Sequence, residues 1–195
     1  MPRVLNVGGG SKRTPLPPHY AGFEHVLLDI DPRGRPDIVC DARTLARLEA
    51  AQFEAVYCSH NLEHYYRHDV PRVLSGFLHV LKDGWFAQIR VPDLAAVMRA
   101  MAERELDLED TLYTSPAGPI TALDVFYGYG REIEGSGQDF YAHKTGFTAA
   151  SLRRTLEKAG FSQVHLRAAG YELNALAVKG DPDPAARALL KLPRQ

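Results

Sequence analysis

The chain has 195 residues, of which 45% are hydrophobic and 24% charged, so it can form one domain with a substantial core. A formal net charge of −1 leaves no basic footprint for nucleic acid, and no long apolar stretch, signal peptide or lipidation motif points to a membrane. We therefore expect a cytoplasmic protein whose two cysteines, Cys40 and Cys58, are buried free thiols. The composition specifies no oligomeric state.

The first half of the chain alternates predicted strands and helices. A clear helical pattern covers Asp69–Leu81, with Asp69 as its cap and Asp83-Gly84 as its stop, and a weaker one covers Thr44–Gln52. The predicted strands are short apolar runs rich in Val, Ile or Leu, as buried parallel strands are. They are Arg3–Val7, Val26–Ile30, Asp37–Cys40, Ala55–Ser59 and Phe86–Val91.

Two further helices are predicted after the fifth strand. The first covers Asp93–Arg104, and its inward face is expected to carry Leu94, Val97, Met98 and Met101. The second covers Thr148–Ala159, between a Thr148 cap and a Gly160 stop.

The chain then predicts a hairpin and a tail. Two strands are predicted at Val164–Arg167 and Leu173–Val178. They are joined through Ala169-Gly170-Tyr171-Glu172, and such a hairpin would end the sheet with antiparallel pairing. Residues 1–180 are thus expected to form a single domain, and residues 181–195 a tail with a short helix at Ala185–Leu192.

The segment 106–147 lies outside this alternation. It combines seven aromatic residues with five glycines, a composition that suits a lid or an acceptor pocket over a site, although the aromatics can equally pack on the sheet as a loose insertion. The aromatics are Tyr113, Phe126, Tyr127, Tyr129, Phe140, Tyr141 and Phe147.

The first strand runs into Gly8-Gly9-Gly10, and the second ends on Asp29, a pairing that predicts a nucleoside site because glycines admit a ligand to the backbone and an acid can bind ribose hydroxyls. A dinucleotide site would also need a helix directly after the glycines to hold the pyrophosphate. Here Pro15, Pro17 and Pro18 forbid a regular helix, and Arg13 replaces the third glycine. A ligand with ribose but no phosphate fits better, and S-adenosylmethionine is such a ligand.

A succession of motifs over roughly residues 3–179 resembles the class I S-adenosylmethionine-dependent methyltransferases, particularly the small bacterial type 11 group. The resemblance implies a Rossmann-like α/β fold: a seven-stranded, mostly parallel sheet with a C-terminal antiparallel hairpin and helices on both faces. The motifs are Leu5-Asn6-Val7-Gly8-Gly9-Gly10, Leu28-Asp29-Ile30, Cys40-Asp41-Ala42, Phe53-Glu54-Ala55-Val56, Ser59-His60-Asn61-Leu62-Glu63-His64, Val80-Leu81-Lys82-Asp83-Gly84-Trp85 and Leu156-Glu157-Lys158-Ala159-Gly160-Phe161.

The resemblance also implies how the cofactor is held. Asp29 would accept both ribose hydroxyls, Asp41 would accept a hydrogen bond from the adenine amino group, and Ala42 would supply a backbone donor. Gly8 and Gly10 would lie against the methionine and ribose part, and Ser59 and His60 would face the methionine end. The expected cofactor-binding set is completed by Asn6, Gly9 and Ile30.

The chain departs from the family pattern in places. Asn6 stands where many relatives carry an acid, Glu54 replaces the common Asp, and Asp83 replaces the usual Pro. In the proline loop that replaces the first helix, Lys12 or Arg13 is expected to meet the methionine carboxylate.

Methyl transfer from a sulfonium is an in-line displacement that needs a base only where the attacking atom carries a proton. The candidate bases are His143, Tyr129 and Asp93, and the alternative role of Asp93 is to cap the helix that follows it.

The run His60-Asn61-Leu62-Glu63-His64 also matches the H-x-x-E-H signature of zinc peptidases. That chemistry needs both histidines and the Glu on one helical face, whereas the preceding residues predict a strand that ends at His60. No third ligand is evident downstream, so we expect no metal, and Glu63 and His64 are predicted to brace the loop around the cofactor.

The sequence thus predicts a methyltransferase for a small-molecule acceptor that it does not identify. The alternatives are an NAD-dependent oxidoreductase and a cofactor-binding module without activity.

Overall fold

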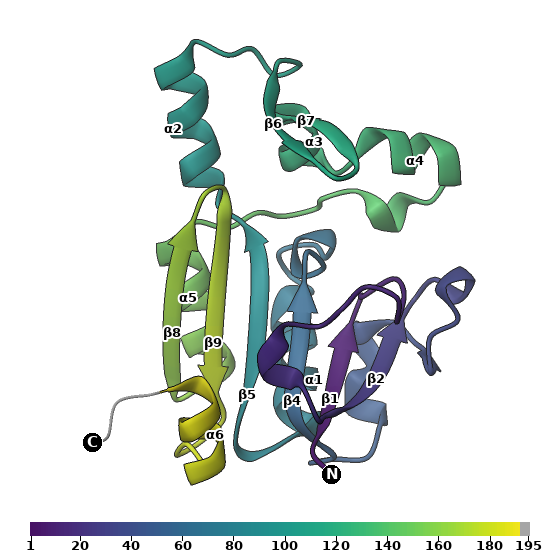
Figure 1. Cartoon of the computed structure of the whole chain (residues 1–195), viewed down its shortest axis with the longest axis vertical. Helices are drawn as coiled ribbons and strands as arrows, with labels where there is room; N and C mark the ends of the chain where they lie inside the picture. Colours follow the sequence, from purple (N-terminus) through teal and green to yellow (C-terminus); the bar gives the residue numbers. More distant parts are fainter. Residues whose placement is uncertain (192–195) are drawn as a thin grey trace.

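A computed structural model describes residues 1–191. It contains a seven-stranded sheet in the order β3-β2-β1-β4-β5-β9-β8 (Figure 1). Strand β9 pairs antiparallel with both neighbours and the other pairs are parallel, which confirms the predicted Rossmann-like α/β fold and its C-terminal hairpin. The strands are β1 (Arg3–Val7), β2 (Glu24–Asp29), β3 (Ile38–Val39), β4 (Phe53–Ser59), β5 (Leu81–Pro92), β8 (Gln163–Ala169) and β9 (Glu172–Val178).

The parallel strands end level with one another. Val7 at the end of β1 pairs with Leu28 of β2 and Cys58 of β4, and Asp29 pairs with Val39 of β3. The residues that follow these strands therefore meet at one edge of the sheet, where open α/β sheets bind ligands.

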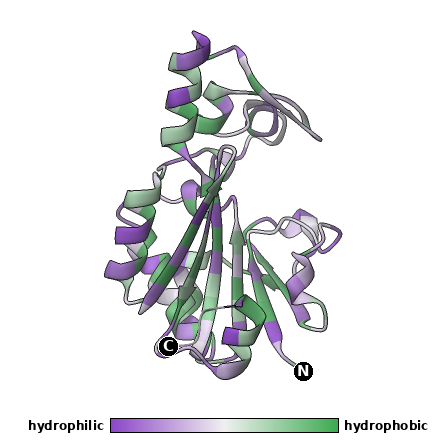
Figure 2. Cartoon of the chain, turned by 60° about the vertical axis from the view of Figure 1, so that its left-hand side comes forward, coloured by the Kyte–Doolittle hydropathy of each residue, from purple (hydrophilic) through white to green (hydrophobic). Residues whose placement is uncertain are grey.

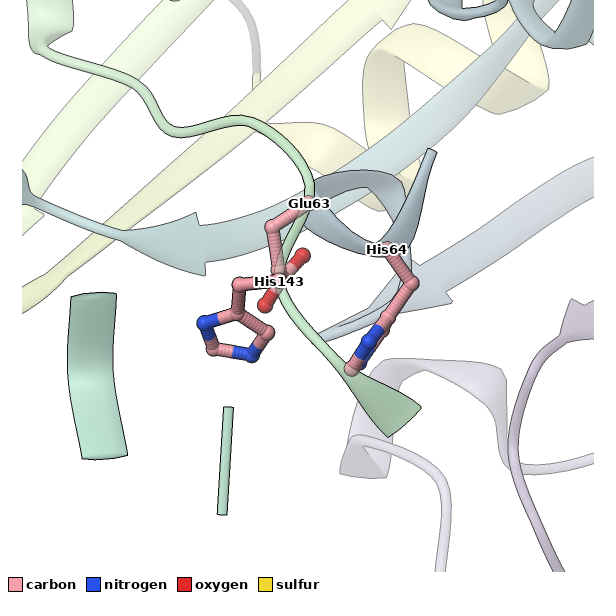
Figure 3. A group of neighbouring side chains, drawn as sticks. All are labelled: Glu63, His64 and His143. Carbon is pink, nitrogen blue, oxygen red and sulfur yellow. The ribbon is translucent and has the colours of Figure 1, made fainter. Parts of the chain in front are cut away.

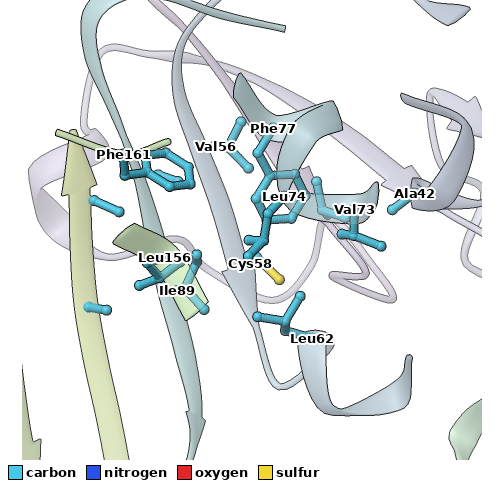
Figure 4. Packing of buried hydrophobic residues seen from close by; sticks show 14 of the residues in the cluster. Ala42, Val56, Cys58, Leu62, Val73, Leu74, Phe77, Ile89, Leu156 and Phe161 are labelled. Atoms are coloured by element: carbon cyan, nitrogen blue, oxygen red, sulfur yellow. The ribbon is translucent and has the colours of Figure 1, made fainter. Parts of the chain in front are cut away.

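One face of the sheet is covered by helices α1 (Val70–Val80) and α5 (Ala149–Ala159) and by the 3₁₀ segment η3 (Ala42–Arg47). Side chains of α1 and α5 pack on β4 and β5 in the main core (Figure 4). Thr148 caps α5 with its side chain, and Gly160 ends it in the left-handed region, as predicted. The central strands are largely hydrophobic, whereas hydrophilic and hydrophobic residues alternate along the helices (Figure 2).

The opposite face has a thinner cover. The segment between β1 and β2 contains one 3₁₀ turn, η1 (Pro18–Tyr20), and no α-helix, as its prolines predict. Tyr20 packs there in the same cluster as Ala186 of α6 (Pro184–Leu190). The tail helix thus lies on the sheet of its own chain; the predicted helix end at Leu192 and the last three residues lie outside the described residues.

The segment 106–147 forms a small unit of its own beyond the carboxyl ends of the strands (Figure 1). With helix α2 (Leu94–Arg104) it builds a separate hydrophobic cluster that includes Val97, Leu112 and Val125. Its elements are β6 (Thr111–Ser115), β7 (Gly118–Thr121), α3 (Ala122–Tyr127), α4 (Gly130–Ser136) and the 3₁₀ turn η5 (Asp139–Tyr141).

Two helix predictions in the first half were wrong in detail. The helix expected over Thr44–Gln52 is the shorter η3, because Thr44 bonds the Asp41 carbonyl through both its N–H and its hydroxyl and so favours i→i+3 bonds. The Asp69 side chain does not cap α1, since it accepts from Arg43 instead.

Two further predictions need correction. Asp83-Gly84 does not stop α1: the helix ends at Val80, and both residues lie within β5, which starts at once. Met98 is 52% exposed, because α2 turns Val97 and Ala100 toward the small unit and leaves Met98 to solvent. Within residues 1–191, no helix combines the length and the apolar character needed to cross a membrane.

Candidate functional site

A cavity of about 500 Å³ lies at the carboxyl edge of the sheet. Its wall contains Gly8 and Gly10, which follow β1, Asp29, which ends β2, Ile30, which follows it, and His60, which follows β4. The strand order reverses between β1 and β4, so the cavity occupies the topological switch point, which is the usual ligand site of such sheets.

The floor of this first cavity requires glycine. Gly8 has φ +70°, and a Cβ atom there would lie 2.1 Å from Nδ2 of Asn61. On the other side, a Cβ on Gly34 would lie 1.7 Å from the carbonyl oxygen of Gly10. Gly8 and Gly34 therefore allow three loops to pack closely, whereas a Cβ atom on Gly10 would meet nothing within 4 Å, so the backbone at Gly10 is open to a ligand.

Asp29 fixes the glycine loop. It is 7% exposed, and its two carboxylate oxygens each accept a backbone N–H at 2.9 Å, one from Gly10 and one from Asp31. A carboxylate has about four acceptor sites, so Asp29 can still accept hydrogen bonds from a ligand in the cavity.

Asp31 connects this loop to the segment 106–147. Its carboxylate accepts from Arg33 and, at 2.7 Å, from the hydroxyl of Tyr141, which lies 110 residues away in sequence. The hydrogen bond from Arg33 and that from Tyr141 hold the pKa of Asp31 well below its usual range. Burial, together with the bond to Asp31, raises the pKa of Tyr141 to about 12, so the hydroxyl stays protonated and donates.

The predicted adenine end lies at the next loop. Asp41 borders the cavity, caps η3 and forms an ion pair with Arg43. Burial raises the pKa of Asp41, but the bonds from Arg43 outweigh it and the pKa is lowered. Ile30 is 41% exposed and adds an apolar side chain to the wall, whereas Ala42 is buried and does not line the cavity.

Other predicted cofactor residues support the wall from behind. Asn6 is buried, contacts His25 through Nδ2 at 3.2 Å, and lies under Gly9, where a Cβ atom would be 2.2 Å from Nδ2 of Asn6. Ser59 ends β4 and does not reach the cavity.

The cations of the proline loop do not reach the cavity either. Lys12 forms an ion pair with Asp37 at 2.6 Å, and Arg13 is exposed. The wall instead contains Lys144, whose ammonium lies 3.8 Å from an exposed carboxylate, that of Asp139.

A second cavity, of about 450 Å³, lies between the sheet edge and the segment 106–147. Tyr113, Tyr129 and His143 line it, while Phe140 and Tyr141 line the first cavity. Four of the seven aromatics of this segment therefore line a cavity, whereas Phe126 packs in the separate cluster with α2, Phe147 is buried in the main core and Tyr127 is 63% exposed.

His60 borders both cavities. Its Nε2 lies 2.9 Å from Glu172 and its Nδ1 lies 3.5 Å from Glu63, while half of the side chain is exposed. Burial lowers the pKa of His60, but these two carboxylates outweigh it and raise the pKa to about 9. His60 is therefore a cation at neutral pH.

The three candidate bases lie in different settings. His143 and Tyr129 line the second cavity, where Nδ1 of His143 lies 2.8 Å from the carbonyl oxygen of Val125 and the Tyr129 hydroxyl donates to Ala117. Asp93 lies in neither wall; it is buried and caps α2 by accepting from Ala95, its alternative role.

Glu63 and His64 contact the segment 106–147: the backbone carbonyl of Glu63 accepts from the N–H groups of Lys144 and Thr145, and Nδ1 of His64 lies 3.1 Å from the Ala142 carbonyl oxygen. His143 joins these two residues, and Glu63, His64 and His143 form one cluster (Figure 3). This cluster was not predicted from the sequence. Arg33, Tyr141 and Lys144 were also missed as wall residues, because their contacts span distant parts of the chain.

No protein-family model matches the chain, and no curated protein matches it. Solved structures do match, and several are methyltransferases. An S-adenosylmethionine-dependent methyltransferase from Archaeoglobus fulgidus superposes with a TM-score of 0.59 at 17% identity, over 91% of this chain and 86% of that one.

Two proteins from Burkholderia thailandensis are also similar. A 1,6-didemethyltoxoflavin-N1-methyltransferase, solved with S-adenosylhomocysteine, gives a TM-score of 0.51 at 17% identity over 92% of this chain and 72% of that one. An O-methyltransferase family protein gives 0.56 at 12% identity over 93% of this chain, which spans about half of that protein, 52%. At these identities the likeness establishes the fold.

Proposed function

We propose that this chain is an S-adenosylmethionine-dependent methyltransferase of the small bacterial type 11 group, acting on a small-molecule acceptor. The observation that carries the proposal is the first cavity, where a glycine floor and Asp29 meet at the switch point of the sheet. The segment after the glycines contains no α-helix, so it lacks the helix N-terminus that a pyrophosphate would need. The fold that the chain shares with known methyltransferases supports the same proposal.

The wall offers a partner for each part of this cofactor. Asp29 has acceptor capacity left for the ribose hydroxyls, and Asp41 and Ile30 lie where adenine would be held. Lys144 is proposed to bind the methionine carboxylate in place of Lys12 or Arg13, because Arg33 and Arg43 in the same wall are each tightly paired.

The acceptor is proposed to bind in the second cavity. His60 borders both cavities, so they adjoin at that residue, and an acceptor atom can face the methionine end of the first cavity there. S-adenosylmethionine supplies an electrophilic methyl group. The chain holds the two partners in line, which can lower the barrier by up to roughly 7–11 kcal/mol. His143 and Tyr129 are proposed to contact the acceptor, since both line this cavity.

Calorimetric titration of the purified chain tests the cofactor. We expect one S-adenosylhomocysteine to bind per chain and NADH not to bind; binding of NADH alone would replace the proposal by an oxidoreductase. Release of S-adenosylhomocysteine in a screen of small-molecule acceptors then tests transfer. Binding without turnover of any acceptor would leave a cofactor-binding module.

A further inference from the structure

Glu63 is a buried carboxylate without a hydrogen bond. It is 1% exposed, and within residues 1–191 neither of its oxygens has a hydrogen-bond partner. Its ion-pair partner is His60, whose Nδ1 lies 3.5 Å away and whose Nε2 is shared with Glu172 at 2.9 Å. A buried carboxylate without hydrogen bonds is costly, and coordination of a metal ion would satisfy its free oxygens.

Two histidines face Glu63 in an arrangement typical of metal ligands. Nδ1 of His64 lies 3.1 Å from the Ala142 carbonyl oxygen, and Nδ1 of His143 lies 2.8 Å from that of Val125. An N–H donated to each carbonyl fixes the tautomer and leaves a lone pair on Nε2, which is how the outer contacts of ligating histidines orient the ring.

The Nε2 atom of His64 lies 3.2 Å from the carbonyl oxygen of His60. With Nδ1 as the donor to Ala142, a metal ion on Nε2 would relieve this contact between two acceptors; without one, Nε2 has to carry a proton and donate to His60. The ligand atoms of Glu63, His64 and His143 all lie within 4.8 Å of one another (Figure 3).

We propose that Glu63, His64 and His143 bind one divalent transition-metal ion, for which zinc is the best representative. Two imidazoles and one carboxylate form a three-ligand set that leaves positions open, and imidazole favours zinc and its neighbours over magnesium. Ligand atoms around zinc lie about 3.4 Å apart, so separations of up to 4.8 Å have to shorten by up to about 1.4 Å.

This site differs from the peptidase arrangement that the sequence suggested. His60 and His64 do not share a helix: β4 ends at Ser59, His60 has φ +50°, and η4 spans Leu62–His64. The missing ligand is His143, which comes from the segment 106–147 far along the chain. The metal was rejected from the sequence because this third ligand is not near the motif.

The position of the three ligands between the two cavities indicates a role for the ion. His64 lines the first cavity and His143 lines the second, so the open positions lie where the two adjoin. This role rests on the proposed function: an oxygen or nitrogen atom of the acceptor completes the coordination and is thereby held for transfer. The lone pair of His143 then binds the ion and does not serve as a base.

The experiment is titration of the untagged full chain, first dialysed against a chelator, with Zn²⁺ and separately with Mg²⁺. We expect one Zn²⁺ per chain and no comparable Mg²⁺ binding. Glu63→Gln and His143→Ala should each weaken Zn²⁺ binding roughly 100-fold or more, since loss of an outer contact alone costs 10- to 100-fold. His68→Ala, which alters a histidine that is 80% exposed, is the matched control and should bind as the wild type does.

Two further measurements keep the outcome decisive. Zn²⁺ should raise the unfolding temperature of the wild type but not of Glu63→Gln, and Co²⁺ should give visible d–d absorption only where the three ligands are intact. Absence of stoichiometric Zn²⁺, or unchanged affinity in a folded Glu63→Gln variant, would overturn the site in favour of protonated histidines beside Glu63. Titration of the same samples with S-adenosylhomocysteine separates this outcome from failure of the proposed function.

Discussion

Replacing Asp29 by Asn tests the role of this carboxylate most directly. In the native protein its two oxygens accept backbone N–H groups from Gly10 and Asp31, both at 2.9 Å. An Asn side chain keeps the shape but has only one oxygen. Whichever way the amide turns, its NH₂ group faces one of the two backbone N–H groups, so one hydrogen bond is lost and two donors oppose each other.

The magnitude follows from this geometry. A hydrogen bond to a charged group contributes about 1.5–3 kcal/mol, so Asp29→Asn should lower the free energy of unfolding by about that amount. The ribose hydroxyls also lose a charged acceptor, and a similar free energy in binding corresponds to a roughly 10- to 100-fold higher Kd for S-adenosylhomocysteine.

Glu54→Gln is the matched control for this variant. Glu54 likewise accepts a backbone N–H, from Arg3 at 2.7 Å, and pairs with Lys82, but it lies near the start of β4, away from the cavity. Chemical unfolding should show that both variants are destabilised, and calorimetry should show that Asp29→Asn alone loses affinity. Wild-type affinity in a folded Asp29→Asn, or an equal loss in both variants, would refute this reasoning.

Gly8→Ala should weaken S-adenosylhomocysteine binding at least about 10-fold, because alanine is strained at φ +70° and its Cβ atom meets Asn61, whereas Gly22→Ala, at φ +86° with open space around it, should leave the affinity unchanged. Tyr141→Phe removes the hydroxyl that donates to Asp31, so hydrogen exchange in residues 130–141 should speed up and the Kd should rise about 3- to 10-fold; unchanged exchange would mean that this contact does not hold the segment. In the native protein a thiol reagent should modify partly exposed Cys40 first. Cys58 should react only on unfolding, since burial and the charge of Glu63 raise the pKa of its thiol; two equally fast thiols would contradict this.

The sheet could be predicted because its signals are local. Each parallel strand is a short apolar run, the prolines after Gly10 exclude a helix, and Thr148 and Gly160 mark the ends of α5. The positions of the glycine floor and of Asp29 were predictable for the same reason, since Gly8 directly follows β1 and Asp29 is the last residue of β2.

The rest of the site depends on contacts that no local pattern encodes. Tyr141 reaches Asp31 across 110 residues, and His143 meets Glu63 only because the segment 106–147 folds back over the sheet edge. Lys12 was predicted to bind the methionine carboxylate because of its position after the glycines, but it forms an ion pair with Asp37. Such pairings are decided by the packing of separate elements.

One short segment, residues 139–145, ties the two cavities together. Tyr141 bonds Asp31 on the side of the first cavity, Lys144 and Thr145 donate to the carbonyl of Glu63, and His143 faces the second cavity. A ligand that orders this segment from one cavity therefore reduces the loss of conformational entropy when a second ligand binds in the other cavity. Under the proposed function, S-adenosylhomocysteine and an acceptor should for this reason bind with positive cooperativity, which calorimetric titration of one in the presence of the other measures.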